Sequence, residues 1–420
     1  MPEENLAIDG GKPIRNKPLP DGNKFGREEL RELTDVIDSG VMSRFGGTKV
    51  EQFENEFAGI HGAKYGIASS SGTASLHIAV GMLNPSPGDE IIVGPITDVG
   101  SVIPILAQTA IPIFCDVQRD TFNMHPEDIE RKIRKKTKAI MAVHVFGNPC
   151  DMDAIMSIAK RHNLTVIEDC SQAHLSEYKG RLVGTIGDIA CFSLQQSKHI
   201  SCGDGGITIT NNDDYGTRGK LFMDKGWDRS REGQPTYVIF APNYRMNELS
   251  GAVALAQVRK MRNTVAQRRA RGDLLSELCK NPYVVPQRVL DGCKHTYWLY
   301  AMQVKDDAPF TPEDFAAAMR AEGISCTPHF FGRPVFLSHE AVRDQRLFGN
   351  SRFPFDHPDA NPVSYDENTA PNAQKVYDQM IVGYARPRVN QQWATQFLSE
   401  EDIHDIARAI KKVSRHLRTR

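Results

Sequence analysis

The chain has 420 residues, of which 40% are hydrophobic and 25% are charged, and its formal net charge at pH 7 is −1. This composition is typical of a globular protein of two domains, and the balanced charge argues against a nucleic-acid-binding protein. No apolar run approaches ~18 residues, and the acidic, polar N-terminus lacks the order of a signal peptide, so we expect neither a membrane span nor a membrane partner.

Helix-like and strand-like segments alternate between residues 50 and 215. Residues 50–62 carry apolar side chains at a helical spacing, and 74–83 and 152–163 also read as helices. Short apolar runs predict strands at 65–69, 90–93, 111–117, 165–170, 188–194 and 205–211. Because these strands are apolar throughout rather than alternating, they predict an α/β fold with a mainly parallel sheet covered by helices.

The pattern changes after about residue 245. Residues 248–278 predict one long helix or two joined ones, 295–304 a strand, and 311–323 and 399–417 helices that begin at the caps Thr311 and Ser399. Residues 341–390 are rich in Pro, Asn and Asp and predict a long irregular excursion. We therefore expect a large domain over 1–260, with an N-terminal arm, and a smaller C-terminal α/β domain over 261–420.

Three polar clusters follow predicted strands: SSSGT (69–73), EDCSQAH (168–174) and SLQQSK (193–198). Ligands of parallel sheets bind at the carboxyl ends of the strands, so these clusters are expected to share one crevice. Lys198, in the third cluster, is a candidate for an amine that forms a Schiff base with an aldehyde cofactor such as pyridoxal phosphate.

Pyridoxal phosphate needs a carboxylate at its pyridine nitrogen, donors for its phosphate and a neutral donor at its phenolic oxygen. Gly72 and Thr73 open a helix after a strand and are candidates for the phosphate, together with the hydroxyl of Ser193. Asp169, at a strand end, is the candidate for the ring nitrogen, and Gln172 can reach the same ring. The sequence thus predicts a pyridoxal-phosphate site.

Other kinds of site fit less well. GDGG (203–206) follows Lys198, whereas a Walker loop has its glycines before the lysine, and SSSGTAS is not a dinucleotide-binding motif. Cys191, His199 and Cys202 lack a defined zinc spacing, so we expect no metal. His144, His174 and His329 are read as structural. The eight scattered cysteines include no C-x-x-C pair, which favours reduced thiols and a cytoplasmic location.

The motifs together resemble the DegT/StrS-type aminotransferases of sugar and cyclitol biosynthesis, which have the aspartate-aminotransferase (fold type I) architecture with a seven-stranded-type sheet. The resemblance is carried by LAIDGGKPIR (6–15), SSGTASLHIAV (70–80), the segment 166–198, GDGG and NYRMNELSGAVALAQV (243–258), and it is strong over about residues 6–262.

The resemblance assigns roles residue by residue. Lys198 matches the Schiff-base lysine that also moves the proton, and Asn243 matches a residue that reaches the phosphate of a neighbouring subunit, which implies a homodimer with its active site at the interface. Arg245 is a weaker candidate. Asp169, Gln172, Gly72, Thr73 and Ser193 match the cofactor-binding residues named above.

Two positions deserve comparison with the family pattern. Members that eliminate a hydroxyl have histidine in place of the lysine; here Lys198, not His199, is in register with Ser193 and GDGG, which favours transamination. Family members commonly place an aromatic residue after a threonine to stack on the cofactor, and this chain has Asp98 there.

The resemblance implies an enzyme that moves an amino group from L-glutamate or L-glutamine to a keto-cyclitol or keto-sugar. The "GGKPIR" start and the glutamine pair before Lys198 favour the keto-cyclitol branch. The alternatives are a nucleotide-linked keto-sugar aminotransferase, a pyridoxal-phosphate-dependent sugar dehydratase and a non-catalytic sensor with the same fold.

Overall fold

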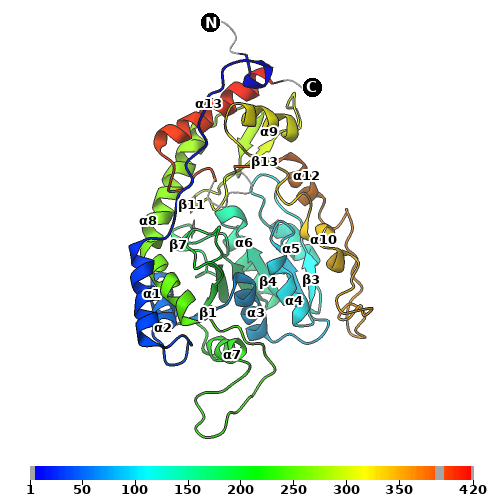
Figure 1. The fold of residues 1–420 in the computed structure, drawn as a ribbon. Helices are drawn as coiled ribbons and strands as arrows, with labels where there is room; N and C mark the ends of the chain where they lie inside the picture. Colours follow the sequence, from blue (N-terminus) through cyan, green and yellow to red (C-terminus); the bar gives the residue numbers. More distant parts are fainter. Residues whose placement is uncertain (1–4, 384–391, 418–420) are drawn as a thin grey trace.

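The computed structural model describes residues 5–383 and 392–417. A seven-stranded sheet with the order β1-β9-β8-β5-β4-β2-β3 forms the centre of its larger part (Figure 1). The sheet is parallel from β8 to β3, and β9 runs antiparallel to both β8 and β1. The strands are β1 (Tyr65–Ser69), β2 (Glu90–Val93), β3 (Ile111–Phe114), β4 (Thr137–Val143), β5 (Thr165–Asp169), β8 (Ile189–Ser193) and β9 (Gly206–Thr210). The predicted α/β fold with a mainly parallel sheet is confirmed.

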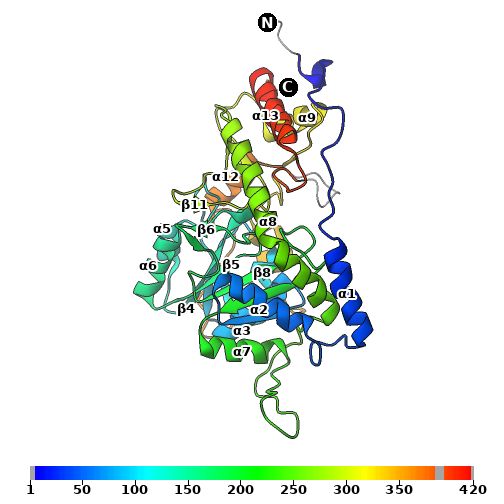
Figure 2. The same ribbon diagram turned by 90° about the vertical axis from the view of Figure 1, so that its left-hand side faces the viewer.

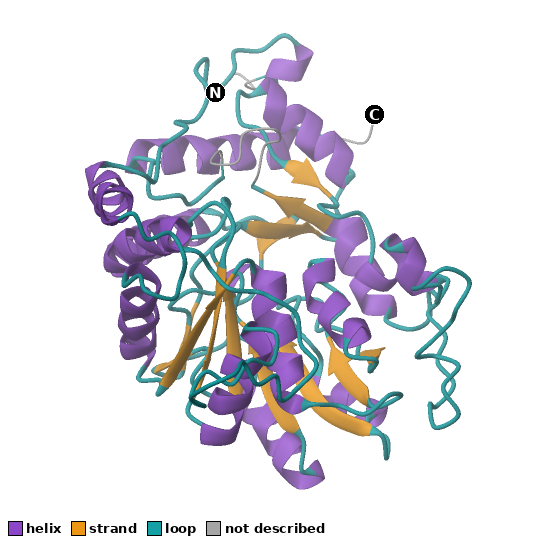
Figure 3. Cartoon of the chain, turned by 60° about the horizontal axis from the view of Figure 1, so that its bottom comes forward, coloured by secondary structure: helices purple, strands orange, loops and turns teal. Residues whose placement is uncertain are grey.

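Both faces of this sheet are buried, as the uninterrupted apolar strands predicted. In β2, Ile91 and Val93 pack into one core cluster and Ile92 packs into another. Helices cover the sheet, as Figure 3 shows. They are α2 (Lys49–His61), α3 (Gly72–Leu83), α4 (Ile103–Ala107), α5 (Pro126–Lys132), α6 (Met152–His162) and α7 (Asp213–Met223). α1 (Arg27–Ser39) packs instead against α8 (Glu248–Leu278).

Helix α8 (Glu248–Leu278) is a single helix of 31 residues, not two joined helices. It packs against α1 and α2 near its start and against α13 (Glu400–His416) farther along, so it joins the part of the molecule that holds α1 and α2 to the part that holds α13 (Figure 2). Residue 260, the predicted domain boundary, lies inside this helix, and the division into 1–260 and 261–420 stays a prediction. Among residues 5–383 and 392–417, no helix has the length and apolarity that crossing a membrane requires.

A second, antiparallel sheet has the order β10-β12-β14-β13 and packs against α9 (Pro312–Ala321). Its strands are β10 (Val284–Pro286), β12 (Ala301–Val304), β14 (Met380–Val382) and β13 (Thr327–Pro328). Thr311 and Ser399 cap α9 and α13 as predicted. The predicted strand 295–304 is wrong before Ala301, because Tyr297 has a φ of 51°, which no extended strand permits. A small third sheet joins β6 (Glu177–Tyr178), β7 (Arg181–Leu182) and β11 (Cys293–Lys294).

The predicted irregular excursion 341–390 is only partly irregular. It follows α10 (Val335–Ser338), overlaps α11 (Glu340–Arg343) and includes α12 (Pro371–Gln379) and all of β14, while 384–390 lie outside the described residues. Tyr365 donates a hydrogen bond to the carbonyl of Pro112 in β3 (2.7 Å), and Asn361 donates one to Glu90 (2.8 Å). Because β3 is the edge strand, the excursion covers an edge that would otherwise be open to pairing.

Candidate active site

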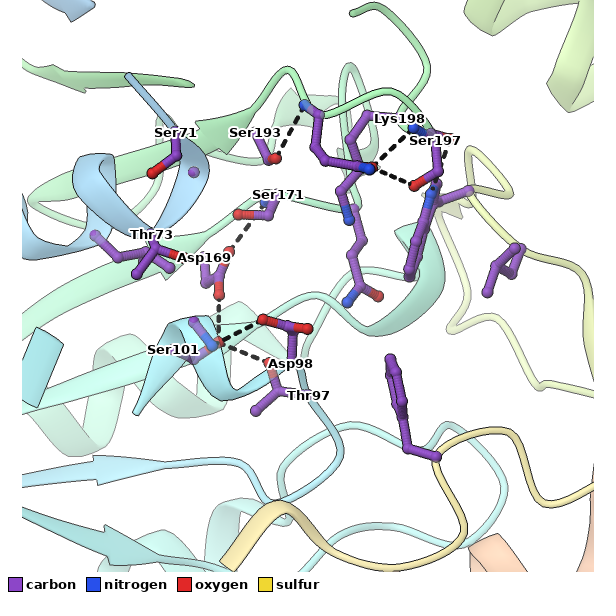
Figure 4. A pocket seen from close by; sticks show the side chains of 18 of the residues that line it. Ser71, Thr73, Thr97, Asp98, Ser101, Asp169, Ser171, Ser193, Ser197 and Lys198 are labelled. Atoms are coloured by element: carbon purple, nitrogen blue, oxygen red, sulfur yellow. Dashed lines mark hydrogen bonds between the residues drawn. The ribbon is translucent and has the colours of Figure 1, made fainter. Parts of the chain in front are cut away.

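The three polar clusters meet around one cavity of about 400 Å³ (Figure 4). β5 and β8 are parallel neighbours whose carboxyl ends carry two of the clusters, and the start of α3 supplies the third. Six of the seven predicted site residues line this cavity, namely Gly72, Thr73, Asp169, Gln172, Ser193 and Lys198.

The start of α3 has the form of an anion-binding site. Ser71 caps the helix by accepting a hydrogen bond from the Ala74 amide (3.0 Å), which leaves the amides of Gly72 and Thr73, both lining the cavity, to bind an anion. A Cβ on Gly72 would lie 2.7 Å from the Cβ of Ser193, so only glycine allows the two elements to approach so closely. The Ser193 oxygen accepts the Gln195 amide (3.3 Å), and its proton remains available for a phosphate.

Asp169 is a buried carboxylate held from two sides. The Ser101 hydroxyl donates to one oxygen (2.7 Å) and the Ser171 amide donates to the other (3.0 Å). Thr97 in turn bonds the Ser101 hydroxyl (2.6 Å). This network fixes the carboxylate in the cavity wall, where it can pair with a protonated ring nitrogen.

The amide of Gln172 has a defined orientation. Its oxygen accepts the Phe146 backbone amide (2.7 Å), so its NH₂ group is the part that can donate into the cavity. A neutral donor at this position suits the phenolic oxygen of a pyridoxal ring.

Lys198 is 9% exposed, and its Nζ lies 3.6 Å from the centre of the Trp298 ring. Burial lowers the pKa of its amine from 10.5 to about 8, while the charges of Asp98 and Asp169 act in the opposite direction. A neutral amine is therefore available close to physiological pH, as a nucleophile requires. His199 faces elsewhere, because its Nε2 bonds the carbonyl of Thr296 (3.0 Å).

Asp98 also lines the cavity, and one of its oxygens accepts the Gly100 amide (2.8 Å). The aromatic side chains that line the cavity are Trp298, Phe330 and Phe331, so none of them comes from the segment where the family pattern has a ring.

Asn243, the seventh predicted residue, does not line the cavity of its own chain. It is exposed, forms a backbone bridge with Asp224 and accepts the Arg245 amide on its side-chain oxygen (3.3 Å). Arg245 forms an ion pair with Asp224. These two residues follow a long loop that projects beyond α7 (Figure 1).

Within the GDGG turn (203–206), only Gly203 has a positive φ (90°). Gly205 and Gly206 are needed for close packing instead: a Cβ on Gly206 would lie 2.5 Å from the Ser71 carbonyl oxygen.

The three side chains considered for zinc, those of Cys191, His199 and Cys202, form hydrogen bonds with three different backbone carbonyls. His144 and His329 bond carboxylates, those of Glu168 and Glu313.

Sequence reasoning missed two residues of the site. Ser101 lies in PITDVGS, and no motif marks it as the partner of Asp169. Trp298 lies in a segment that was read as a strand, and its contact with Lys198 joins positions 100 residues apart. The only sequence signal for Trp298 was its residue type, since the chain has three tryptophans and this one follows the polar pair His295 and Thr296.

Comparison with known proteins agrees with this geometry. The sequence profile of the DegT/DnrJ/EryC1/StrS aminotransferase family matches residues 23–355. The chain is 30% identical over 433 residues to an L-glutamine:2-deoxy-scyllo-inosose aminotransferase of Streptoalloteichus tenebrarius, covering 98% of each chain. It is 38% identical over 275 residues to the GDP-perosamine synthase of Escherichia coli O157:H7, covering 66% of this chain and 74% of that one.

A solved aminotransferase from Psychrobacter cryohalolentis has the same fold, with a TM-score of 0.81 and 29% identity over 94% of this chain and 98% of that one. The matched segment contains the cavity residues Gly72 to Lys198, and the α/β fold agrees with the predicted architecture. The chain therefore belongs to the DegT/DnrJ/EryC1/StrS aminotransferase family.

Proposed function

We propose that this protein is a pyridoxal-phosphate-dependent aminotransferase that transfers an amino group from L-glutamine or L-glutamate to a keto-cyclitol. The observation that carries this proposal is the meeting of Lys198, Asp169, Gln172 and the Gly72 cradle around one cavity. Each supplies a group that the cofactor needs, on a different element of the fold.

When bound, pyridoxal phosphate supplies an aldehyde that takes up an amino group and a ring that accepts electrons. The start of α3 and the Ser193 hydroxyl would hold its phosphate, Asp169 its ring nitrogen, and the Gln172 NH₂ group its phenolic oxygen. The amine of Lys198 would hold the aldehyde and, when free, carry the proton to and from the substrate carbon.

The cavity wall favours an uncharged acceptor. Among the described residues that line the cavity, Lys198 is the only cationic side chain, whereas Asp98 and Asp204 contribute carboxylates in addition to Asp169. A nucleotide-linked sugar carries a diphosphate, which proteins usually bind with arginine or lysine. Carboxylates and aromatic rings such as Phe330 suit a neutral polyol better, and a relative named for an inosose substrate covers 98% of this chain.

The nucleotide-linked keto-sugar remains the second candidate acceptor, because the relative named GDP-perosamine synthase is 38% identical.

We further propose a homodimer in which Asn243 reaches the phosphate of the neighbouring site. The exposure of Asn243 and its place outside the cavity of its own chain support this role. The eight cysteines are all free, which fits a cytoplasmic location.

The experiment is a comparison of acceptors. The purified enzyme, loaded with pyridoxamine phosphate, is mixed with scyllo-inosose, with its 2-deoxy form and with a nucleotide-linked 4-keto-sugar, and the rise of the aldehyde cofactor's absorbance is followed. Faster turnover of a keto-cyclitol is expected. Turnover of the nucleotide-linked sugar alone would contradict the keto-cyclitol assignment.

A further inference from the structure

The turn that carries Lys198 is held by side chains from outside it. Its three consecutive carbonyls, of Gln196, Ser197 and Lys198, each accept a hydrogen bond from a distant side chain. The Lys24 Nζ donates to the carbonyl of Gln196 (2.9 Å) and to that of Lys198. The indole N–H of Trp298 donates to the carbonyl of Ser197 between them (3.1 Å).

Lys24 is itself anchored at its backbone. Its carbonyl accepts hydrogen bonds from Gln257 Nε2 (3.0 Å) and from Lys260 Nζ (3.3 Å), both on α8. Gln257 also accepts the Ser201 amide at its side-chain oxygen (3.2 Å), three residues after Lys198. Lys24 therefore links α8 to the segment that bears the reactive amine.

The charge environment of Lys24 is unusual. Among residues 5–383 and 392–417, no carboxylate forms an ion pair with Lys24, although its side chain is only partly exposed to solvent. Burial, with repulsion from Arg268 and Lys198, lowers the pKa of Lys24 to about 7. An ammonium with little access to water and no acid partner is costly unless other groups accept its hydrogen bonds, and here the carbonyls of Gln196 and Lys198 accept them. The titratable and charged groups that face this region are Lys198, His174, His199, Arg268, Lys260 and Glu29.

We propose that Lys24 is a positioning residue for Lys198: its Nζ holds the carbonyls on either side of Ser197, and its charge lies close enough to repel that of the Lys198 amine. The proposal rests on the proposed role of Lys198 as the cofactor-binding lysine. Because like charges repel, the Lys24 ammonium also disfavours a proton on the nitrogen of Lys198.

The test compares three variants. Lys24→Met and Lys24→Gln remove the positive charge that binds the carbonyls of Gln196 and Lys198, whereas Lys24→Arg keeps a positive charge and hydrogen-bond donors. Lys17→Met, an exposed lysine of the same arm, is the matched control. The first readout is amide hydrogen exchange of the peptide 194–202 in cofactor-free protein. The second is the pH midpoint of the visible band of the cofactor linked to Lys198.

We expect Lys24→Met and Lys24→Gln to exchange at least about fivefold faster in this peptide, with the midpoint raised by roughly 0.3–1 pH unit. Lys24→Arg should keep the slow exchange, because it keeps donors for both carbonyls, and its permanent charge should not raise the midpoint. Lys17→Met should match the wild type within about twofold and ~0.2 unit. Three outcomes would overturn the proposal. The first is unchanged exchange in both neutral variants, the second is faster exchange without a shifted midpoint, and the third is a Lys24→Arg variant that behaves like Lys24→Met. Should Lys24→Met fail to fold, Lys24→Gln and Lys24→Arg still decide it. A wild type that shows no visible band would instead refute the proposed function.

Discussion

The amine of Lys198 lies against the face of the Trp298 indole, with Nζ 3.6 Å from the ring centre, and the indole N–H binds the carbonyl of Ser197 one residue earlier. One side chain thus flanks the reactive nitrogen and holds its backbone. The ring face stabilises a cation, so it favours the charged form of the amine.

Trp298→Leu is expected to lower the pKa of Lys198 in cofactor-free protein by somewhat less than one unit, because a cation–π contact of about 1 kcal/mol is lost. Competitive acylation of Lys198 at a series of pH values, read by peptide mass spectrometry, measures this pKa. Phe331→Leu removes another aromatic side chain of the same cavity and should leave it unchanged. A pKa that stays the same or rises in Trp298→Leu would contradict the contact.

Lys198→Met is expected to stabilise the cofactor-free protein at neutral pH. Folding lowers the pKa of this amine from 10.5 to about 8, so the unfolded chain binds more protons between these two pH values. Stability therefore rises with pH across this window, and the cost of burying the amine is fully present below pH 8. Denaturant unfolding at pH 7 should show the variant more stable by up to ~3 kcal/mol. The difference should vanish near pH 10.5, and a less stable variant at pH 7 would refute the shift.

Gly72→Ala should fold but bind the cofactor at least about tenfold more weakly, because the new Cβ would displace Ser193 from the phosphate cradle. Equilibrium dialysis with pyridoxal phosphate measures the loss. Gly59→Ala, at an exposed position of α2 with no atom within 4 Å of the added Cβ, is the matched control. That control should bind normally and gain about 0.5–1 kcal/mol of stability. Equal affinity for pyridoxal phosphate in the two variants would contradict a phosphate-binding site at Gly72 and Ser193.

Ser101→Ala should reduce kcat/KM about tenfold, since the Asp169 carboxylate loses a hydrogen bond of 2.7 Å that holds it in the cavity wall. Ser171→Ala is matched to it, because Ser171 contacts the same carboxylate only through its backbone amide, which the substitution keeps. Steady-state kinetics of both variants provide the check. Equal loss of kcat/KM in the two variants would contradict a role of the Ser101 hydroxyl in holding the Asp169 carboxylate.

Asn243→Ala and Lys198→Ala should each be nearly inactive alone and recover activity when mixed, because each site would take Lys198 from one chain and Asn243 from the other. Random pairing after refolding together predicts about a quarter of the wild-type rate. Absence of recovery in a mixture that forms dimers would mean that Asn243 acts within its own chain or not at all.

The sequence predicted the large sheet and six residues of the cavity because both depend on local signals. Apolar strands alternating with helices specify the parallel sheet, and the ends of β5 and β8 carry Asp169 and the segment leading to Lys198. Contacts between distant segments left no such signal: Trp298 meets Lys198, and Lys24 reaches the same turn, only through the tertiary fold. The strand expected at 295–300 failed for a related reason, since buried Arg268 binds the carbonyls of Tyr297 and Trp298 and replaces strand pairing there.

The absorbance spectrum of the purified protein with pyridoxal phosphate, before and after addition of L-glutamine or L-glutamate, tests the central role of Lys198 most directly. We predict a band near the edge of the visible range that borohydride fixes on the peptide containing Lys198. The amino donor should shift this band, and Lys198→Ala should lack it. A band that persists in Lys198→Ala, or one that neither amino donor shifts, would contradict the assignment.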